Sequence, residues 1–317
     1  MRKFTYLFFV ILLILSLSLF GCTKDEGEEP NNTDDPIGVE DENEEDDTKT
    51  SEDIINEFGE IIADNEETED LIKFIDNNIE KVTSIEGDQM VIELINRLEE
   101  SKDDLTDKLL DKGEIMTVSS QRYFPEENVK DIEDKELREL VEEIIANKYK
   151  LQMAEGMYYP IVDYEKLKEY DDYVSEEIKD YVHLKAVDSN TVIASDAALV
   201  ISHNELADII IDTEEYLEKY AGGVYHEEVE TMYNNKLDIY LSGLPNTLIY
   251  DYNTNKINED VLESYIETGS KGDTVTSFIV GKYINIIRDN ENIIDDEVLK
   301  KADELVEEAL TLLVNAK

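Results

Sequence analysis

Apolar residues recur three and four residues apart along most of the chain that follows the first fifty residues. Such runs occupy 54–62, 71–82 and 91–109, and Gly113 is a stop signal after the third. This spacing is typical of amphipathic helices. Their apolar stripes are narrow, as in a small bundle or an antiparallel coiled coil. The pattern predicts an N-terminal helical segment over 51–113.

The helical period is lost over 114–130, which we interpret as a linker. It resumes beyond this segment and predicts a main α-helical domain over 131–317. Ser175 is a predicted helix N-cap, and Ser202 with Glu205 has the spacing of a capping box.

Two places depart from the helical pattern. A helix that opens near Leu137 is predicted to run to about Met153, after which Gly156 and Pro160 interrupt it. Apolar residues followed by a polar turn predict a short extended piece near 247–257. With only 13 Gly and 5 Pro, the chain has few hairpin signals. The predicted fold class is therefore all-α, a bundle-like body with at most one short extended segment.

The N-terminus has the layout of an export signal. Arg2 and Lys3 precede an apolar run from Phe4 to Phe20, and the run ends at Cys22, the only cysteine of the chain. This run is at the short limit for spanning a bilayer. One interpretation is an uncleaved membrane anchor with an incidental cysteine, and the other is a signal peptide over 1–21 that ends at a lipidated cysteine.

The stretch Leu19-Phe20-Gly21-Cys22 resembles the lipobox of bacterial lipoproteins with a type II signal peptide, although Phe20 is larger than the usual residue there. The resemblance implies cleavage between Gly21 and Cys22 and a diacylglycerol, with acyl chains such as palmitate, on the Cys22 thiol. Two acyl chains give stable anchoring where one gives only marginal binding. The implied location is the outer face of the cytoplasmic membrane.

Residues 22–50 are predicted to be a lipidated cysteine followed by a disordered acidic tether. Between 23 and 50 there are 13 acidic residues and two lysines, and only Ile37 and Val39 are sizeable apolar residues. Such a segment buries no core and extends by self-repulsion. It serves as a spacer on one interpretation and as a collector of Ca²⁺ or Mg²⁺ on another.

The charge limits the choice of partners. The chain has 79 Asp and Glu against 29 Lys and Arg, a net charge of −50. Nucleic acid and anionic lipid headgroups are repelled by such a surface. The membrane is therefore expected as a partner only through the lipid anchor, with an envelope protein or a glycan as further partners and weak divalent-cation binding in addition.

Motifs for catalysis or metal binding are lacking in the sequence. There is no HExxH, no GxSxG and no P-loop, and we predict no catalytic residue, no metal ligand and no cofactor. An alternation of oxygen ligands from Asp251 resembles the start of an EF-hand loop, but Lys256 stands where glycine is required. The histidines fall on separate predicted helices: His183, His203 and His226.

Tyrosine is the one unusual feature of composition, because 13 of the 18 tyrosines lie between 158 and 252. Tyr158, Tyr159, Asp163 and Tyr164 form a candidate binding surface, since tyrosine combines apolar area with a hydroxyl. The alternative is that these rings fill packing positions between helices.

The function expected from these observations is a non-catalytic binding or assembly role at the cell envelope. The alternative is a solute- or glycan-binding lipoprotein, which ranks lower because the strand–helix alternation of two-lobed binders is missing. A cell-wall enzyme is the third hypothesis.

Overall fold

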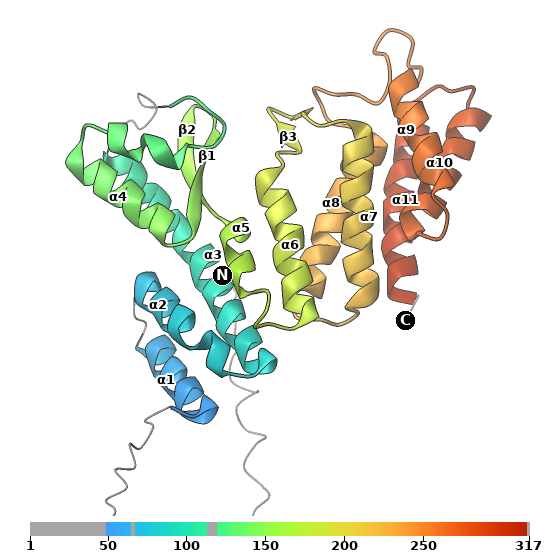
Figure 1. Ribbon diagram of the computed structural model, residues 1–317. Coiled ribbons are helices and arrows are strands. Elements are labelled where there is room, and N and C mark those ends of the chain that lie inside the picture. Colours follow the sequence, from blue (N-terminus) through green and yellow to red (C-terminus); the bar gives the residue numbers. More distant parts are fainter. Residues whose placement is uncertain (1–48, 65–66, 113–118, 316–317) are drawn as a thin grey trace, which may run out of the picture. The chain divides into compact units, whose positions relative to one another are not determined.

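The structure is a computed structural model that describes residues 49–64, 67–112 and 119–315. All of them belong to the compact unit formed by Thr48–Lys317. Helices dominate this unit, so the predicted all-α class is confirmed (Figure 1). The predicted signal peptide, with Gly21 and Cys22, lies outside the described residues, as does the predicted tether up to residue 48.

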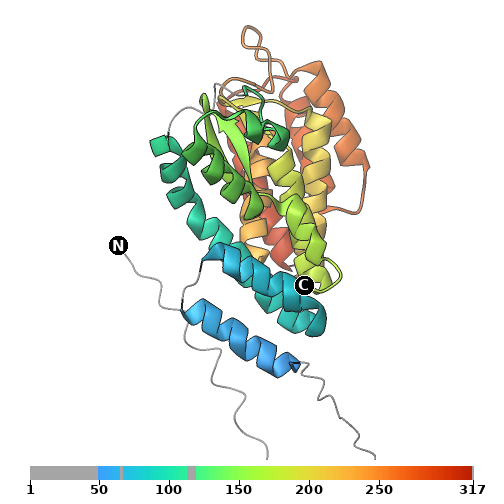
Figure 2. The same cartoon turned by 60° about the vertical axis from the view of Figure 1, so that its left-hand side comes forward.

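The first part of the unit is built around one long helix. Its elements are α1 (Ser51–Ala63), α2 (Thr68–Asn78), the 3-10 helix η1 (Ile79–Lys81), α3 (Ser84–Lys112), the 3-10 helix η3 (Glu126–Asp131) and α4 (Lys135–Ala146). Both α2 and α4 pack on α3. Helices α1 and α2 lie side by side, with the rings of Phe58 and Phe74 stacked at 6.1 Å (Figure 2). The three helical runs predicted between 54 and 109 are thereby confirmed.

A β-hairpin stands where the sequence predicted the end of a long helix. Helix α4 already ends at Ala146, and β1 (Tyr149–Ala154) pairs antiparallel with β2 (Met157–Val162). Glu155 and Gly156 both have positive φ, as a two-residue hairpin turn requires. The prediction of a helix to Met153 is wrong because side chains here alternate between buried and partly exposed, a period of two.

The segment predicted as a linker is described from Ser119 onward. Tyr123 forms a β-bridge with Gln152 of β1, and η3 follows. This part of the segment therefore packs on the hairpin. A single cluster of buried apolar residues extends from Ile54 to Leu313. The division of the chain into 51–113 and 131–317 remains a prediction.

The second part of the unit consists mainly of longer helices. Its elements are α5 (Tyr164–Leu167), the 3-10 helix η4 (Lys168–Tyr170), α6 (Glu176–Asn190), β3 (Ala194–Ser195), β4 (Ala198–Leu199), α7 (His203–Lys219), α8 (His226–Ser242), α9 (Glu259–Ser270), α10 (Val275–Asp289) and α11 (Asp296–Asn315). Ser202 and Glu205 form the predicted capping box at the start of α7. Ser175 is the N-cap of α6 as predicted, although its side chain makes no capping hydrogen bond.

The predicted extended piece near 247–257 is reduced to isolated bridges, of which one joins Tyr250 to Ile257. The Asp251 carboxylate accepts hydrogen bonds from the backbone N–H groups of Asn253 and Thr254 and from the Thr254 hydroxyl. These bonds satisfy the carboxylate within its own turn. The stretch that resembles an EF-hand is therefore an Asx turn.

Helix α6 connects the two parts of the unit. It contacts α5 and η4 on one side and α7 on the other, and Figure 1 shows it between them. The backbone N–H of Ser175, just before α6, donates to Asp88 of α3 at 2.7 Å. Both surface features described below lie along this helix.

Candidate functional site

The four residues of the predicted tyrosine surface are mostly inside the protein. Tyr158 is 1% exposed and Tyr164 is 2% exposed, and Asp163 is also buried. Tyr159 alone is partly accessible. These residues therefore do not meet as an exposed surface, which agrees with the alternative that tyrosine rings fill packing positions.

Each buried hydroxyl of this group has a partner. The Tyr158 hydroxyl donates to the backbone oxygen of Gln121 at 2.6 Å, and the Tyr164 hydroxyl donates to Glu99 at 2.9 Å. The Tyr164 ring also packs edge-on against Tyr181 at 6.3 Å. A ring with both its face and its hydroxyl engaged is not free to stack on a sugar.

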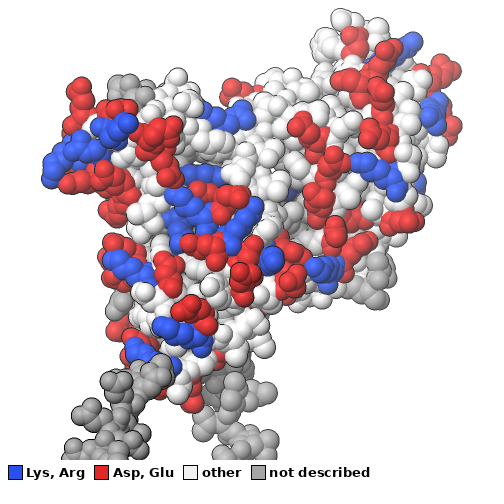
Figure 3. All heavy atoms as spheres, in the orientation of Figure 1, with Lys and Arg blue, Asp and Glu red and all other residues white. Residues whose placement is uncertain are grey.

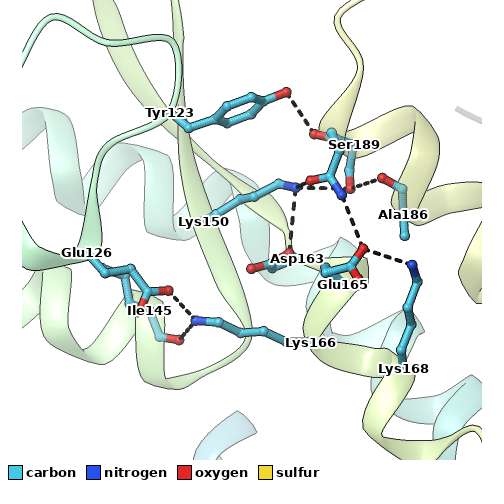
Figure 4. Close-up of polar contacts among 11 residues, drawn as sticks. Tyr123, Glu126, Ile145, Lys150, Asp163, Glu165, Lys166, Lys168, Ala186 and Ser189 are labelled. Carbon is cyan, nitrogen blue, oxygen red and sulfur yellow. Dashed lines mark hydrogen bonds and ion pairs between the residues drawn. The ribbon is translucent and has the colours of Figure 1, made fainter.

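A cluster of lysines and carboxylates covers the place where the hairpin and α5 approach α6. Figure 3 shows it as a dense patch of interleaved basic and acidic side chains, and Figure 4 shows its contacts. Lys150 of β1 donates to Ser189 and Asn190 at the C-terminal end of α6 and lies 3.6 Å from Asp163.

Two further lysines extend this network. Lys166 donates to Glu126 and to the backbone oxygen of Ile145, and Lys168 pairs with Glu165. The acceptors of Lys150 and Lys166 lie on other elements of the fold, whereas Lys168 pairs within its own segment. We interpret the network as a polar joint between the hairpin and α6, because its charges are already compensated.

Burial affects the lysine at the centre of this joint. It lowers the pKa of Lys150, while the nearby Asp163 carboxylate acts in the opposite direction. Desolvation disfavours the charged amine, and the carboxylate and the Asn190 carbonyl oxygen offset part of that cost. Lys150 is therefore held by partners and is not available to an incoming anion.

A groove between α6 and α7 is the better candidate for a binding site. It encloses about 240 Å³ and is lined by Asp180, His183, Leu184, Val187, Ile209, Asp212, Glu215, Tyr216 and Lys219. Leu184, Ile209 and Tyr216 are buried and form the floor, whereas Asp212, Glu215 and Lys219 are exposed at the rim. Val187 is 41% exposed, which leaves apolar surface open to solvent in the groove.

One end of the groove is electrically balanced. Asp180 accepts from Lys219 and from the Tyr220 hydroxyl, each at 2.7 Å. These contacts lower the pKa of Asp180 in spite of its partial burial. His183 lies 2.6 Å from the Asp171 carboxylate. Charges at this end therefore already have partners from the protein itself.

The other end of the groove carries two carboxylates that are in no ion pair. Neither Asp212 nor Glu215 lies within ion-pair distance of a described lysine, arginine or histidine, whereas nearby Asp208 pairs with Lys271. Partial withdrawal from water raises the pKa of Asp212, the negative charges of Asp208 and Glu215 add to this effect, and the positive charge of Lys271 opposes it. A cation at this end would relieve that repulsion.

Tyr216 contributes an unusual group to the floor. Its side chain is 4% exposed, and its buried hydroxyl has no hydrogen-bond partner within the described residues. Burial raises the pKa of this hydroxyl. The ring lies 4.9 Å from Tyr220 and 6.4 Å from Tyr181, which stacks on Tyr225 at 3.6 Å. Tyrosine packing therefore makes the floor of the groove stiff.

Metal and catalytic chemistry find no further support in this part of the chain. The described residues contain no group of three or more His, Cys, Asp or Glu side chains placed to hold a metal ion. The three histidines are on α6, α7 and α8, as the sequence predicted. His183 lies beside the Asp171 carboxylate at the rim of the groove.

The chain matches no known protein family, no curated protein and no solved structure in the comparisons made. The site must therefore be argued from its own geometry. The helices of the described ranges include none that combines the length and the hydrophobicity a bilayer span requires.

The sequence did not predict this groove. On α6 the lining residues follow a helical spacing of three, one and three, and on α7 the same spacing begins at Asp212, with Ile209 three residues before it. That spacing was visible in the sequence. The sequence did not indicate which face of α6 packs against which face of α7. The mixed polar and apolar faces of both helices therefore resembled ordinary solvent-exposed surface.

Proposed function

We propose that this chain is a lipid-anchored extracytoplasmic protein with a non-catalytic binding or assembly role at the cell envelope. The observation that carries the proposal is the place of Cys22. It is the only cysteine in 317 residues, and it directly follows an apolar run that begins behind two basic residues. A thiol there serves as an acceptor for an acyl-bearing lipid, with no second cysteine available for a disulfide.

The net charge of −50 supports the same role. Such a surface does not adhere to anionic headgroups by itself, so membrane attachment depends on the anchor. The groove between α6 and α7 supplies a surface suited to a partner, because it combines exposed apolar area with unpaired carboxylates.

The alternatives are a solute- or glycan-binding lipoprotein and a cell-wall enzyme. Pockets for drug-sized ligands enclose about 300–1,000 Å³. The groove between α6 and α7 encloses about 240 Å³, so this groove would cover a whole solute poorly. Glycan binding is also less favoured, because the rings of Tyr158 and Tyr164 are buried.

The experiment is metabolic labelling with a palmitate analogue in a Gram-positive host, followed by membrane fractionation. The wild type is expected to give a labelled, shortened protein in the membrane fraction. Cys22→Ala is expected to give an unlabelled precursor, and Thr23→Ser serves as the matched control that keeps the thiol. Normal shortening and labelling of Cys22→Ala would overturn the proposal.

A further inference from the structure

The two helices that form the groove are antiparallel (Figure 1), and one ion pair indicates their register. The Asp180 carboxylate of α6 lies 2.7 Å from the Lys219 ammonium of α7. Seven residues span about 10.5 Å of helix, close to two turns. Val187 lies seven residues after Asp180 on α6, which is about two turns. Asp212 lies seven residues before Lys219 on α7, the same distance in the same direction. The exposed apolar side chain and the unpaired carboxylate are therefore at the same level of the groove.

Glu215 lies one turn from Asp212 on the same side of α7, and both line the groove. Leu184 and Ile209 complete the apolar wall around them. An occupant that suits this end has a cationic head and an apolar stem. Lysine and arginine side chains have this construction, since their methylene stems bury against apolar surface while the head remains polar.

The volume of the groove decides between a side chain and a larger ligand. About 240 Å³ is less than the usual pocket for a free drug-sized molecule. It does suffice for one long side chain presented by a partner polypeptide, whose backbone remains outside. The carboxylates of Asp212 and Glu215, which are in no ion pair, then complement the charge of that side chain.

On this basis we infer that the groove between α6 and α7 binds a lysine or arginine side chain of a partner polypeptide. Its stem lies against Leu184, Val187 and Ile209, and its head lies between Asp212 and Glu215. The inference rests on the proposed binding role and names the chemistry of the partner. The buried Tyr216 hydroxyl, which has no hydrogen-bond partner among the described residues, belongs to the other end of the groove, where Glu177 and Asp180 are the nearby carboxylates, and is not part of the proposed contact.

The test uses the full chain in detergent micelles at 0.15 M NaCl, with isotope-labelled Val, Leu and Ile methyl groups observed by NMR. The probe is a short peptide, acetylated and amidated, with one lysine between two leucines. Two comparison probes are the same peptide with norleucine in place of lysine, and n-butylamine. At this salt concentration charges more than about 8 Å apart are largely screened, so diffuse attraction is reduced.

The lysine peptide is expected to shift the methyl signals of Val187, Leu184 and Ile209 in a saturable manner. The double variant Asp212→Asn/Glu215→Gln is expected to weaken binding at least about tenfold, because two charge-assisted contacts are removed. The control double variant Glu218→Gln/Glu227→Gln removes the same charge from exposed positions of α7 and α8 outside the groove and is expected to bind within about twofold of the wild type. The thermal midpoint of each variant verifies folding.

Four results would overturn the inference, and the last of them leaves the anchoring untouched. One is equal binding of the norleucine peptide, and another is an equal loss in the control double variant. The third is n-butylamine binding as tightly as the peptide, which would assign the groove to a free amine. Absence of groove shifts with normal labelling of Cys22 would refute only this inference. Groove binding without labelling of Cys22 would refute only the anchoring.

Discussion

Replacement of Gly87 by alanine tests how α3 positions the start of α6. Gly87 is buried in α3, and a Cβ atom added there would lie 2.1 Å from the backbone oxygen of Tyr173. This is more than about 1 Å closer than carbon and oxygen approach without repulsion. The contacting atom belongs to the backbone of the turn that precedes Ser175, so no side-chain rotation relieves it. Either α3 or this turn must move.

The expected magnitude follows from two opposing effects. Forcing an extra methyl group into a packed interior costs about 1–3 kcal/mol. Replacing glycine by alanine inside a helix raises the free energy of unfolding by about 0.5–1 kcal/mol. Gly87→Ala should therefore lower the free energy of unfolding by about 1–2 kcal/mol, and a loss of 1 kcal/mol lowers the thermal midpoint of a protein of this size by about 2–4 °C.

Gly59→Ala is the matched control. Gly59 lies within α1, and a Cβ atom added there would meet nothing within 4 Å. The same substitution should there raise the free energy of unfolding by about 0.5–1 kcal/mol, because only the helix effect remains. Urea denaturation followed by circular dichroism measures both variants. If Gly87→Ala is as stable as Gly59→Ala, the close approach of α3 to Tyr173 is refuted.

Three further predictions concern the charged groups. Lys150→Met should lower the free energy of unfolding by about 1–3 kcal/mol, because it leaves the buried Asp163 without its counterion. Adding Asp163→Asn should recover part of this loss, and strict additivity of the two changes in a double-mutant cycle would contradict the prediction. Burial raises the pKa of Glu214, which accepts hydrogen bonds from the backbone N–H groups of Val275 and Thr276, so its contribution to stability is largest below its ordinary pKa and falls as the pH rises. The thermal midpoint of the wild type relative to Glu214→Gln should therefore decrease between about pH 4 and pH 7. An increase would show that the hydrogen bonds outweigh the burial. Ca²⁺ at millimolar concentration should raise the thermal midpoint gradually beyond an equal ionic strength of NaCl, because several carboxylates share each ion weakly; one stoichiometric submicromolar site in a titration calorimeter would contradict this.

Local sequence signals predicted the helical elements well. The Ser202–Glu205 capping box and the apolar runs between 54 and 109 both depend on residues within about four positions of each other. Hydrogen bonds and apolar spacing at this range form wherever the local sequence allows them. They can therefore be read without knowledge of the rest of the fold.

The hairpin marks the limit of that reading. Tyr149 and Leu151 are apolar in a stretch that continues the composition of α4, so helical and strand periods competed over a few residues. The decision came from pairing with β2 and from packing of β2 on α3. Strand propensity depends on such neighbours more than helix propensity does.

The predicted tyrosine surface is a second case in which the sequence alone could not decide. The ring of tyrosine suits a core and its hydroxyl suits a wet interface, so the sequence alone left both interpretations of Tyr158 and Tyr164 open. The structure buries both rings and gives each hydroxyl an acceptor far away in the sequence. A partner for a hydroxyl can be found only once the chain is folded.

The sequence by itself determined the helical class, the excess of negative charge and the isolated position of Cys22 behind its apolar run. Only the tertiary structure decided that Val187 and Asp212 share one groove and that Lys150 reaches the end of α6. The physical reason is the separation along the chain over which each interaction acts. Periodicity and composition act along the chain, whereas a groove is defined by the register of two helices, which here depends on the contact between Asp180 and Lys219 across 39 positions.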